Sequence, residues 1–275
     1  MVAGPPEENI DHVAVPPAVR DVAEGRAIRP VWVNERGGVT FAVGGQPVAC
    51  FVKWAPTGSG LDLTAEAARM AWAVAYTPVP AILGEGADAE GAWLATTAMP
   101  GENAVSERYR RDPATAVAAV GAGLRALHDV LPVEQCPFSW SSDVRLARAA
   151  TLPAAVPWDD ATFPVPVSWD HAAHQGLTVA DARRILDDPP TVDRLVVCHG
   201  DACAPNTLIG DDGRWSSHVD LGALGVGDRW ADIAIATWST QWNYGPGWER
   251  ALLDAYGIEP DPERTAWYRL LWDMT

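Results

Sequence analysis

Apolar residues in the N-terminal third of the chain come in short runs that glycine, proline or acidic residues separate. Gly37-Gly38 follows the first run and Gly44-Gly45 follows the second, as expected of turns between antiparallel strands. The last two runs flank an acidic loop. The pattern therefore predicts a five-stranded antiparallel sheet that ends near Met99. The predicted strands are residues 31–34, 39–43, 47–54, 79–85 and 91–99.

Helical periodicity appears first in residues 63–76, where Ala, Met and Trp recur at helical spacing and Thr64 is a suitable N-cap. Beyond Gly101 the chain becomes mostly helical. Asp112-Pro113 is typical of a cap and first turn, and one apolar face continues from there to the end of the predicted helix. That face consists of Val117, Val120, Leu124 and Leu127, and the helix is expected to run through Asp129.

The remaining chain predicts short strands around loops and then three closing helices. The expected strands are residues 194–201, 206–210 and 214–220, and the expected helices are residues 228–241, 247–256 and 262–272. Residues 1–30 show no long period and are expected to pack poorly. Prolines and tryptophans interrupt any helix in residues 151–168, so an irregular segment is expected there.

Composition narrows the class of protein. No run approaches the roughly 20 apolar residues that a membrane-spanning helix needs, and the N-terminus lacks the basic and apolar regions of a signal peptide. We expect a soluble, cytoplasmic protein. Its net charge of -16, from 36 acidic and 20 basic residues, disfavours nucleic acid and anionic membranes as partners and favours a cationic one. Solubility alone is the alternative explanation. The four cysteines show neither a disulfide framework nor the spacing of zinc ligands.

Candidate chemistry concentrates in residues 196–222. An apolar run there leads to His199, Asp201 and Asn206, and a second leads to Asp220. Two carboxylates and an amide form an all-oxygen set that suits Mg²⁺ held between protein and phosphates. The spacing from Asp201 to Asn206 matches the catalytic loop of protein kinases, where the aspartate accepts the proton of the substrate hydroxyl. The alternative is that these side chains only cap turns.

Lys53 is unusual because every one of the other nineteen basic residues is arginine. It stands in the apolar run "CFVKWAP", which predicts a strand. A compact ammonium on a slim stem suits contact with phosphates, whereas the alternative is a lysine that extends from a strand edge into solvent.

The segments "HGDACAPN" and "VDLGALGVGDRWADIA" resemble the aminoglycoside 3'-phosphotransferases, and the resemblance extends over residues 31–275 in matching order. Further matches are "PVACFVKWAP", "EAARMAW", "WLATTAMPG", "LRALHDV" with "QCPF", "HQGL" and "GIEPDPERTAWYRLL". The resemblance implies an α+β, two-lobed protein-kinase-like fold with a five-stranded antiparallel sheet plus helix and a mostly helical C-terminal lobe. The implied domains are a nucleotide-binding lobe (1–97), a hinge (98–101) and a catalytic and substrate-binding lobe (102–275).

The resemblance also implies a role for each matching residue. Asp201 would be the catalytic base, and Asn206 and Asp220 would be Mg²⁺ ligands. Lys53 would bind the nucleotide phosphates and would be held by Glu66. The remaining implied assignments are the glycine turn Gly37-Gly38 near the phosphates, the hinge backbone from Thr97 to Met99 at the adenine, and a structural pair of Arg229 and Asp232 that braces the catalytic loop.

Departures from that family cluster on the substrate side. The chain has Ala172-Ala173 where the family typically carries acids, and "WSTQWNYG" and "WDMT" where it carries acidic residues and a C-terminal Asp-Glu-Phe-Phe. Because a desolvated ammonium needs a charged partner, fewer carboxylates should weaken recognition of a polycation. The candidate acceptor contacts are Asp170, Trp238, Trp242 and Asp273, although the tryptophans could equally belong to the core.

The expected function is transfer of the γ-phosphoryl group of ATP or GTP, with Mg²⁺, to a hydroxyl of an aminoglycoside-like antibiotic, giving resistance or self-protection. One rival is a kinase of the same fold for another small molecule, such as a nucleoside or peptide antibiotic or a sugar or amino-alcohol metabolite. The other is a ligand-binding protein without catalysis. The expected partner is a cationic or sugar-bearing antibiotic, without nucleic acid or membrane, and the chain is expected to be a monomer or weak dimer.

Overall fold

Contacts between residues divide the chain into two units. The computed structural model describes residues 12–34, 36–151, 177 and 179–275. The N-terminal unit comprises the described residues up to Gly101 and also Ser216–Gly222, and the C-terminal unit comprises Glu102–Trp215 and Ala223–Thr275. Within the described residues, no helix has the length and apolar character needed to cross a bilayer.

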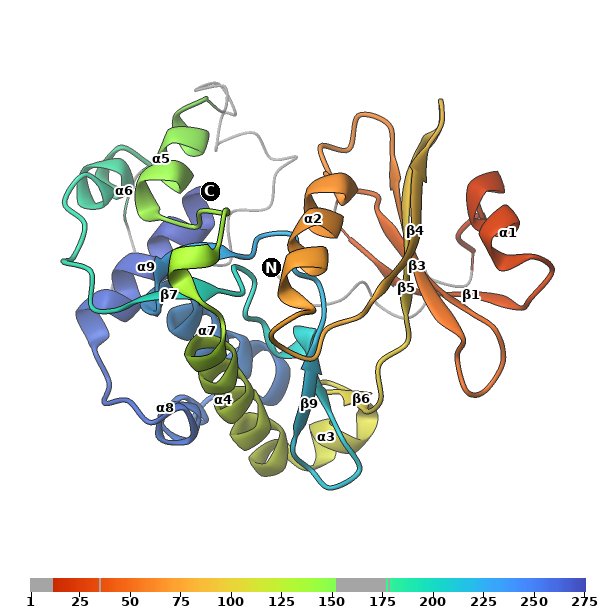
Figure 1. The fold of residues 1–275 in the computed structure, drawn as a ribbon. Helices are drawn as coiled ribbons and strands as arrows, with labels where there is room; N and C mark the ends of the chain where they lie inside the picture. The colour runs from red at the N-terminus through yellow and green to blue at the C-terminus, as the bar shows by residue number, and fades with distance from the viewer. Residues whose placement is uncertain (1–11, 35, 152–176, 178) are drawn as a thin grey trace. The chain divides into compact units, whose positions relative to one another are not determined.

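The N-terminal unit is built on the predicted five-stranded sheet (Figure 1). Its strands pair antiparallel throughout, in the order β1-β2-β3-β5-β4. The prediction of this sheet is confirmed. The strands are β1 (Ile28–Val33), β2 (Val39–Val43), β3 (Cys50–Pro56), β4 (Ile82–Ala87) and β5 (Gly91–Thr97).

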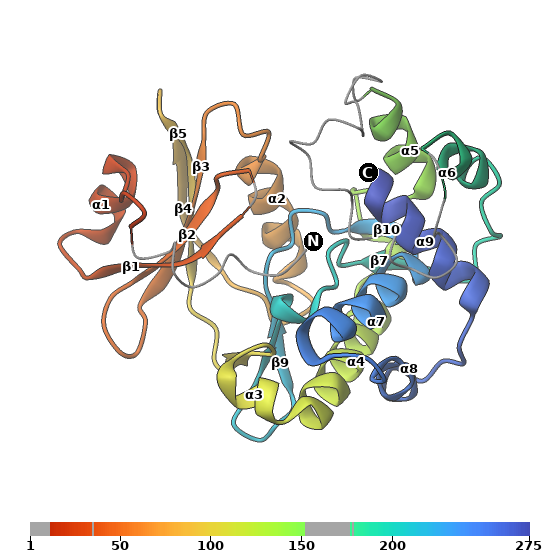
Figure 2. The ribbon, with the colours of Figure 1, turned by 180° about the vertical axis from the view of Figure 1, so that it is seen from behind.

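Two helices cover opposite faces of this sheet (Figures 1 and 2). On one face, α1 (Pro17–Ala23) buries Val19 in a cluster with Phe41, Val52 and other strand residues. The expectation that residues 1–30 pack poorly is therefore wrong for this described segment, because a short helix can bury an apolar side chain without showing a long period.

The other face is covered by α2 (Leu63–Ala73), which packs against β4 and β5. Asp62 caps this helix, and its side chain accepts a hydrogen bond from Ala65 N at 2.8 Å. Thr64 was expected as the N-cap, and that expectation is wrong because the helix already includes Leu63. Successive side chains of a strand alternate between faces. Lys53 therefore points away from the α1 cluster and toward the face that carries α2.

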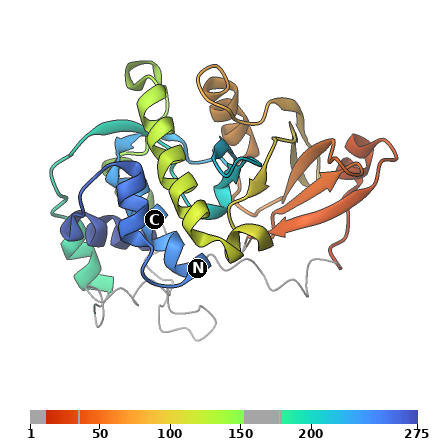
Figure 3. The same cartoon turned by 90° about the horizontal axis from the view of Figure 1, so that it is seen from below.

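The C-terminal unit contains the four helices predicted for it, and helices predominate in this unit (Figure 3). Asp112 caps the first of them, accepting from Thr115 N, and the predicted apolar face of that helix is buried. At Gly121 a Cβ would lie 2.7 Å from Leu252 O, so glycine permits the close approach of α4 and α8. The predicted helices are confirmed as α4 (Pro113–Val130), α7 (Trp230–Tyr244), α8 (Glu249–Tyr256) and α9 (Pro262–Met274).

Short strands bring the central loops of this unit together. β7 (Leu195–Cys198) pairs antiparallel with β10 (Gly225–Asp228), and β6 (Glu102–Asn103) pairs with β8 (Thr207–Ile209). β10 was not predicted, since glycine is rare in strands. Its glycines are needed here because a Cβ at Gly225 would lie 2.6 Å from the backbone of Ser139.

The described chain contains six further elements. They are α3 (Glu107–Arg111), η2 (Val133–Gln135), α5 (Ser142–Thr151), α6 (Val179–Leu186), η4 (Ala204–Asn206) and β9 (Trp215–His218), which leads into Ser216–Gly222. Beyond Thr151, the irregular segment expected at residues 151–168 lies outside the described residues.

Candidate active site

Lys53 lies at the centre of β3, opposite Thr40 of β2 and Leu94 of β5. Its Nζ lies 2.6 Å from Glu66 Oε1, so the ion pair implied for these residues is present, and 2.8 Å from Asp220 Oδ1. All three side chains belong to the N-terminal unit. The strand, the helix α2 and the segment after β9 thus converge on a single ammonium group.

The charge of Lys53 is held firmly by these partners. Burial by itself would lower the pKa of Lys53, but the negative charges of Asp220 and Glu66 and their hydrogen bonds outweigh burial and raise the pKa above its ordinary value. Lys53 is therefore a permanent cation at neutral pH. The Glu66 side chain is only 7% exposed, so an ammonium beside it compensates a nearly buried negative charge.

Asp220 adopts an uncommon backbone conformation, with φ of 63° in the left-handed region. Aspartate tolerates this region better than most residues, and such conformations often occur at functional sites. The side chain of Asp220 is 46% exposed although it contacts Lys53. Asp220 thus keeps part of its side chain exposed to solvent while it pairs with Lys53.

The glycine turn at Gly37-Gly38 is closed by a residue that sequence analysis missed. Asn34 Oδ1 accepts hydrogen bonds from Arg36 N and Gly38 N, and Gly37 N donates to Asn34 O. Glu35, the first residue of the expected turn, lies outside the described residues. Phosphate contact by Gly37 and Gly38 stays a prediction, and it would require Asn34 to release these N–H groups.

The expected adenine-binding backbone follows β5. Thr97 N donates to Ala81 O and Thr97 Oγ1 accepts from Ala81 N, so Thr97 is engaged with the segment before β4. Within the described chain, Met99 N has no hydrogen-bond partner and is only partly buried. Met99 can therefore offer its backbone to a ligand, whereas Thr97 has no free N–H to give.

In the C-terminal unit, β7 leads into the loop that carries Asp201. Gly200 has φ of 84°, and a Cβ there would lie 2.3 Å from Ala223 O, so only glycine fits at this position. Asp201 N donates to His199 Nδ1 at 3.3 Å, and Asn206 Nδ2 donates to Asp201 O at 2.9 Å. Because its amide nitrogen is anchored in this way, Asn206 has its amide oxygen available as a ligand for a cation.

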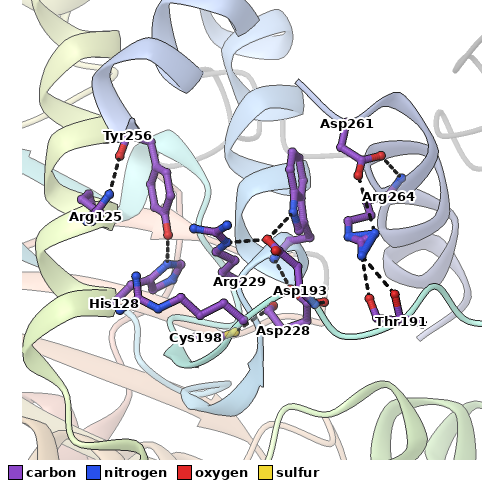
Figure 4. Close-up of polar contacts among 12 residues, drawn as sticks. Arg125, His128, Thr191, Asp193, Cys198, Asp228, Arg229, Tyr256, Asp261 and Arg264 are labelled. Atoms are coloured by element: carbon purple, nitrogen blue, oxygen red, sulfur yellow. Dashed lines mark hydrogen bonds and ion pairs between the residues drawn. The ribbon is translucent and has the colours of Figure 1, made fainter. Parts of the chain in front are cut away.

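The carboxylate of Asp232, at the start of α7, anchors this loop by hydrogen bonds to its backbone. Its carboxylate is fully buried and accepts hydrogen bonds from His199 N at 2.5 Å and Gly200 N at 2.9 Å. His128 Nε2 lies 3.0 Å from the same carboxylate. The other ring nitrogen, His128 Nδ1, lies 2.8 Å from the Tyr256 hydroxyl (Figure 4). Burial alone would raise the pKa of Asp232, but the contacts with His128 and the loop lower it.

The expected pairing of Arg229 with Asp232 is wrong. Arg229 Nε instead pairs with Asp193 Oδ2 at 2.6 Å (Figure 4). Trp230 Nε1 donates to the same carboxylate. The carboxylate oxygens of Asp232 already accept hydrogen bonds from His199 N and Gly200 N and contact His128. The Arg229 side chain is partly exposed and extends to Asp193, in the segment before β7. The bracing role attributed to the pair thus belongs, geometrically, to Asp232 with His128.

The expected acceptor contacts are placed only in part. Trp238 is 4% exposed, its ring lies 4.9 Å from that of Trp242, and the Arg269 guanidinium lies 5.2 Å from its ring centre. Trp242 and Asp273 are half-buried, and Asp170 lies outside the described residues. Contact of these four residues with an acceptor stays a prediction, although the burial of Trp238 is typical of a core side chain.

Sequence reasoning missed several residues that shape the site. One signal was available for His128, because it follows Leu124 by four residues and thus places a polar ring on the apolar face of a helix. Tyr256 and Asp193 gave no such signal, since each meets its partner across a long stretch of sequence.

A family model and individual relatives both relate the sequence of this chain to phosphotransferases. A sequence model described as the phosphotransferase enzyme family matches residues 36–268. The chain is 38% identical over 228 residues to an aminoglycoside 3'-phosphotransferase of Streptomyces fradiae, covering 79% of this chain and 81% of the relative. It is 34% identical over 241 residues to the streptomycin 3''-kinase of Streptomyces griseus, covering 82% of this chain and 84% of that protein.

Solved structures agree with the sequence relatives. An aminoglycoside-3'-phosphotransferase of type VIII superposes with a TM-score of 0.77 at 29% identity, covering 94% of this chain and 97% of that chain. An aminoglycoside phosphotransferase from Streptomyces rimosus, in complex with ADP and streptomycin, superposes with a TM-score of 0.65 at 25% identity, covering 92% and 94%. The fold expected from the sequence is therefore confirmed.

Proposed function

Because the chain belongs to the phosphotransferase enzyme family, we propose that it transfers the γ-phosphoryl group of ATP to a hydroxyl of an aminoglycoside antibiotic. Such a reaction would inactivate the antibiotic and so confer resistance or protect a producing organism. The observation that carries the proposal is the convergence of Glu66 and Asp220 on the only lysine of the chain, within a sequence similar to aminoglycoside phosphotransferases over most of its length.

Lys53 positions the donor in this proposal. An ammonium has three N–H donors, and Glu66 and Asp220 each accept one, so the third can bind a phosphate oxygen of the nucleotide. A point charge on a slim stem fits between two carboxylates and a phosphate, whereas the planar fork of arginine is broader. Met99 supports binding of the nucleotide base through its available backbone N–H.

Asp201 acts as the base in this proposal. It orients the acceptor hydroxyl and takes up its proton as the oxygen attacks phosphorus, while the bond from phosphorus to the leaving ADP oxygen breaks. The hydrogen bonds that Asp232 accepts from His199 N and Gly200 N hold the loop in one conformation. A fixed loop keeps the carboxylate in position, and correct positioning supplies much of the rate in phosphoryl transfer.

In this proposal, Asn206 and Asp220 would each offer one oxygen of the kind that Mg²⁺ prefers. Among the described residues, no group of three or more His, Cys, Asp or Glu side chains could hold a metal by itself. Mg²⁺ is commonly held by one or two protein oxygens together with substrate phosphates. When bound, the ion would neutralise charge on the phosphates.

The first test of the proposal is chemical. We expect the purified protein with ATP and Mg²⁺ to add one phosphate to at least one member of a panel that contains kanamycin-type aminoglycosides and streptomycin, as measured by mass spectrometry of the antibiotic. Nucleoside and peptide antibiotics, together with sugar and amino-alcohol metabolites, test the rival acceptor classes in the same panel. Phosphorylation confined to these compounds would replace the aminoglycoside with another acceptor, and absence of any phosphorylated product would favour the non-catalytic alternative.

The second test concerns the donor site. Replacing Lys53 by methionine should weaken ATP binding about tenfold or more, because one charged contact with phosphate is worth about 1.5–3 kcal/mol. The change also leaves Glu66 unpaired and nearly buried, so K53M/E66Q serves as a matched variant in which the pair is removed together. Calorimetry should show weak ATP binding in both variants, with better thermal stability in the double variant. Unchanged ATP affinity in a folded K53M protein would contradict the role of Lys53.

A further inference from the structure

The two sequence neighbours of Asn206 are both hydrogen-bonded to β6 and the residue that follows it. Asn103 Nδ2 donates to Pro205 O, one residue before Asn206. Ala104 N donates to Thr207 O at 2.9 Å, one residue after it. Ala104 is fully buried and Thr207 is 4% exposed, so water does not compete for the second bond. The backbone is therefore held on both sides of Asn206.

The orientation of the Asn103 amide is fixed by a second contact. Its Oδ1 accepts a hydrogen bond from Val105 N at 2.8 Å. A backbone N–H can only donate, so the atom that faces it must be the amide oxygen, and the amide nitrogen must then face Pro205 O. The side chain of Asn103 thus joins β6 to the loop of Asn206 through one donor and one acceptor of known position.

Tyr244, near the end of α7, holds the second of these two residues in place. Its hydroxyl donates to Ala104 O at 2.8 Å, so the N–H and the carbonyl of Ala104 are both used. Burial raises the pKa of Tyr244, which keeps the hydroxyl protonated and therefore a donor at neutral pH. The residue that binds Thr207 is thus itself bound to α7, the helix that also carries Asp232.

The side chain of Asn206 has little freedom once its backbone is held. Asn206 N donates to Cys203 O at 2.9 Å, and Asn206 Nδ2 donates to Asp201 O at 2.9 Å. The amide is planar, so a fixed Cα and a fixed amide nitrogen together determine where Oδ1 points. That oxygen is the atom proposed to bind Mg²⁺, an ion that demands near-ideal geometry from its ligands.

We propose that Asn103 and Tyr244 are positioning residues for Asn206, which set the place of its amide oxygen by holding the chain on both sides of it. The inference rests on the proposed function, in which Asn206 is a ligand of Mg²⁺. It adds two residues outside the catalytic loop to the metal site, and one of them belongs to the segment "WSTQWNYG", which differs from the family pattern. Replacing the partners of a metal ligand commonly weakens metal binding about tenfold or more.

Asn103→Ser separates the two hydrogen bonds of this side chain. A serine hydroxyl can still accept from Val105 N but is too short to reach Pro205 O. In the complex with a non-hydrolysable ATP analogue, we expect this variant to bind Mn²⁺ about tenfold more weakly than the wild-type protein, as measured by electron paramagnetic resonance of the free ion. The Mg²⁺ concentration for half-maximal phosphorylation should rise by about the same factor, and high Mg²⁺ should restore kcat.

Tyr244→Phe and Tyr109→Phe form a matched pair, because each removes a phenol hydroxyl that donates to a backbone carbonyl. Tyr109 donates to Gly210 O at 3.0 Å, just after β8. Tyr244→Phe should weaken Mn²⁺ binding about threefold, since one hydrogen bond is lost and its effect reaches Asn206 through Ala104. Tyr109→Phe should lower stability in thermal unfolding but leave the Mn²⁺ affinity of the nucleotide complex unchanged.

The outcomes of these measurements are distinct. Wild-type affinity for Mn²⁺ in Asn103→Ser would overturn the proposal, as would equal losses of affinity in Tyr109→Phe and Tyr244→Phe. If Asn103→Ser does not fold, the two tyrosine variants decide the question. Failure of the proposed function would instead appear as a wild-type protein that phosphorylates no antibiotic, while its nucleotide complex still binds Mn²⁺ and still loses affinity in Tyr244→Phe.

Discussion

Replacing Asp201 by asparagine is expected to lower kcat for acceptor phosphorylation by about 10³-fold, within the range that a positioned general base contributes. The amide has nearly the same shape as the carboxylate but cannot take up the proton of an attacking hydroxyl. Asn206 Nδ2 donates to the backbone oxygen of Asp201, a hydrogen bond that the substitution leaves in place, so the loop should keep its conformation. ATP binding, for which we propose Lys53, should stay close to that of the wild-type protein.

The measurement is a steady-state assay of phosphorylated product, with ATP affinity and thermal unfolding determined on the same sample. Asp211→Asn is a suitable control. It removes one negative charge, as Asp201→Asn does, and the Asp211 side chain is fully exposed on the hairpin after β8. Near wild-type turnover in a folded Asp201→Asn protein would mean that another group acts as the base.

The sheet could be predicted from sequence because its signal is local. Alternating apolar runs and glycine turns specify strands directly, and Lys53 stood out by residue type alone. The elements that were missed lack local signals. Two of the four residues of β10 are glycine, and the strand pairs with β7, which lies about 30 positions earlier in the sequence. Asp62 rather than Thr64 caps α2, a difference of two residues that periodicity does not determine.

The site was predictable to the extent that its residues lie in short motifs. Asp201 and Asn206 stand five positions apart in one loop, and Lys53 and Glu66 lie on adjacent elements. The side chains that anchor this loop, Asp232 and His128, come from other parts of the sequence. Asp232 was expected to pair with Arg229, its neighbour at three positions, whereas it meets His128, which is 104 positions away. The spacing of residues along one helix does not show which side chain from a distant part of the sequence will pair with a buried carboxylate.

Replacing Asp232 by alanine should have the largest effect on stability, lowering the free energy of unfolding by about 3–5 kcal/mol, as expected when one partner of a buried charged network is removed. The change leaves His199 N and Gly200 N without acceptors in the protein interior, where each unsatisfied group is costly. Urea denaturation at neutral pH measures the loss. Asp193→Ala is the control, since its pair with Arg229 is partly exposed and is expected to contribute about 1 kcal/mol or less.

The same carboxylate predicts how this stability depends on pH. The pKa of Asp232 is lower in the folded protein than its ordinary value near 3.8, so the folded state binds the proton less readily than the unfolded state. The stabilisation is therefore fully present above about pH 4 and is lost as pH falls further, through the lowered pKa. The difference in unfolding free energy between wild-type and Asp232→Asn should stay constant from pH 6 to 8 and shrink below about pH 4. A difference that instead grows in acid would contradict the assignment of an ionised Asp232 as the anchor of the loop.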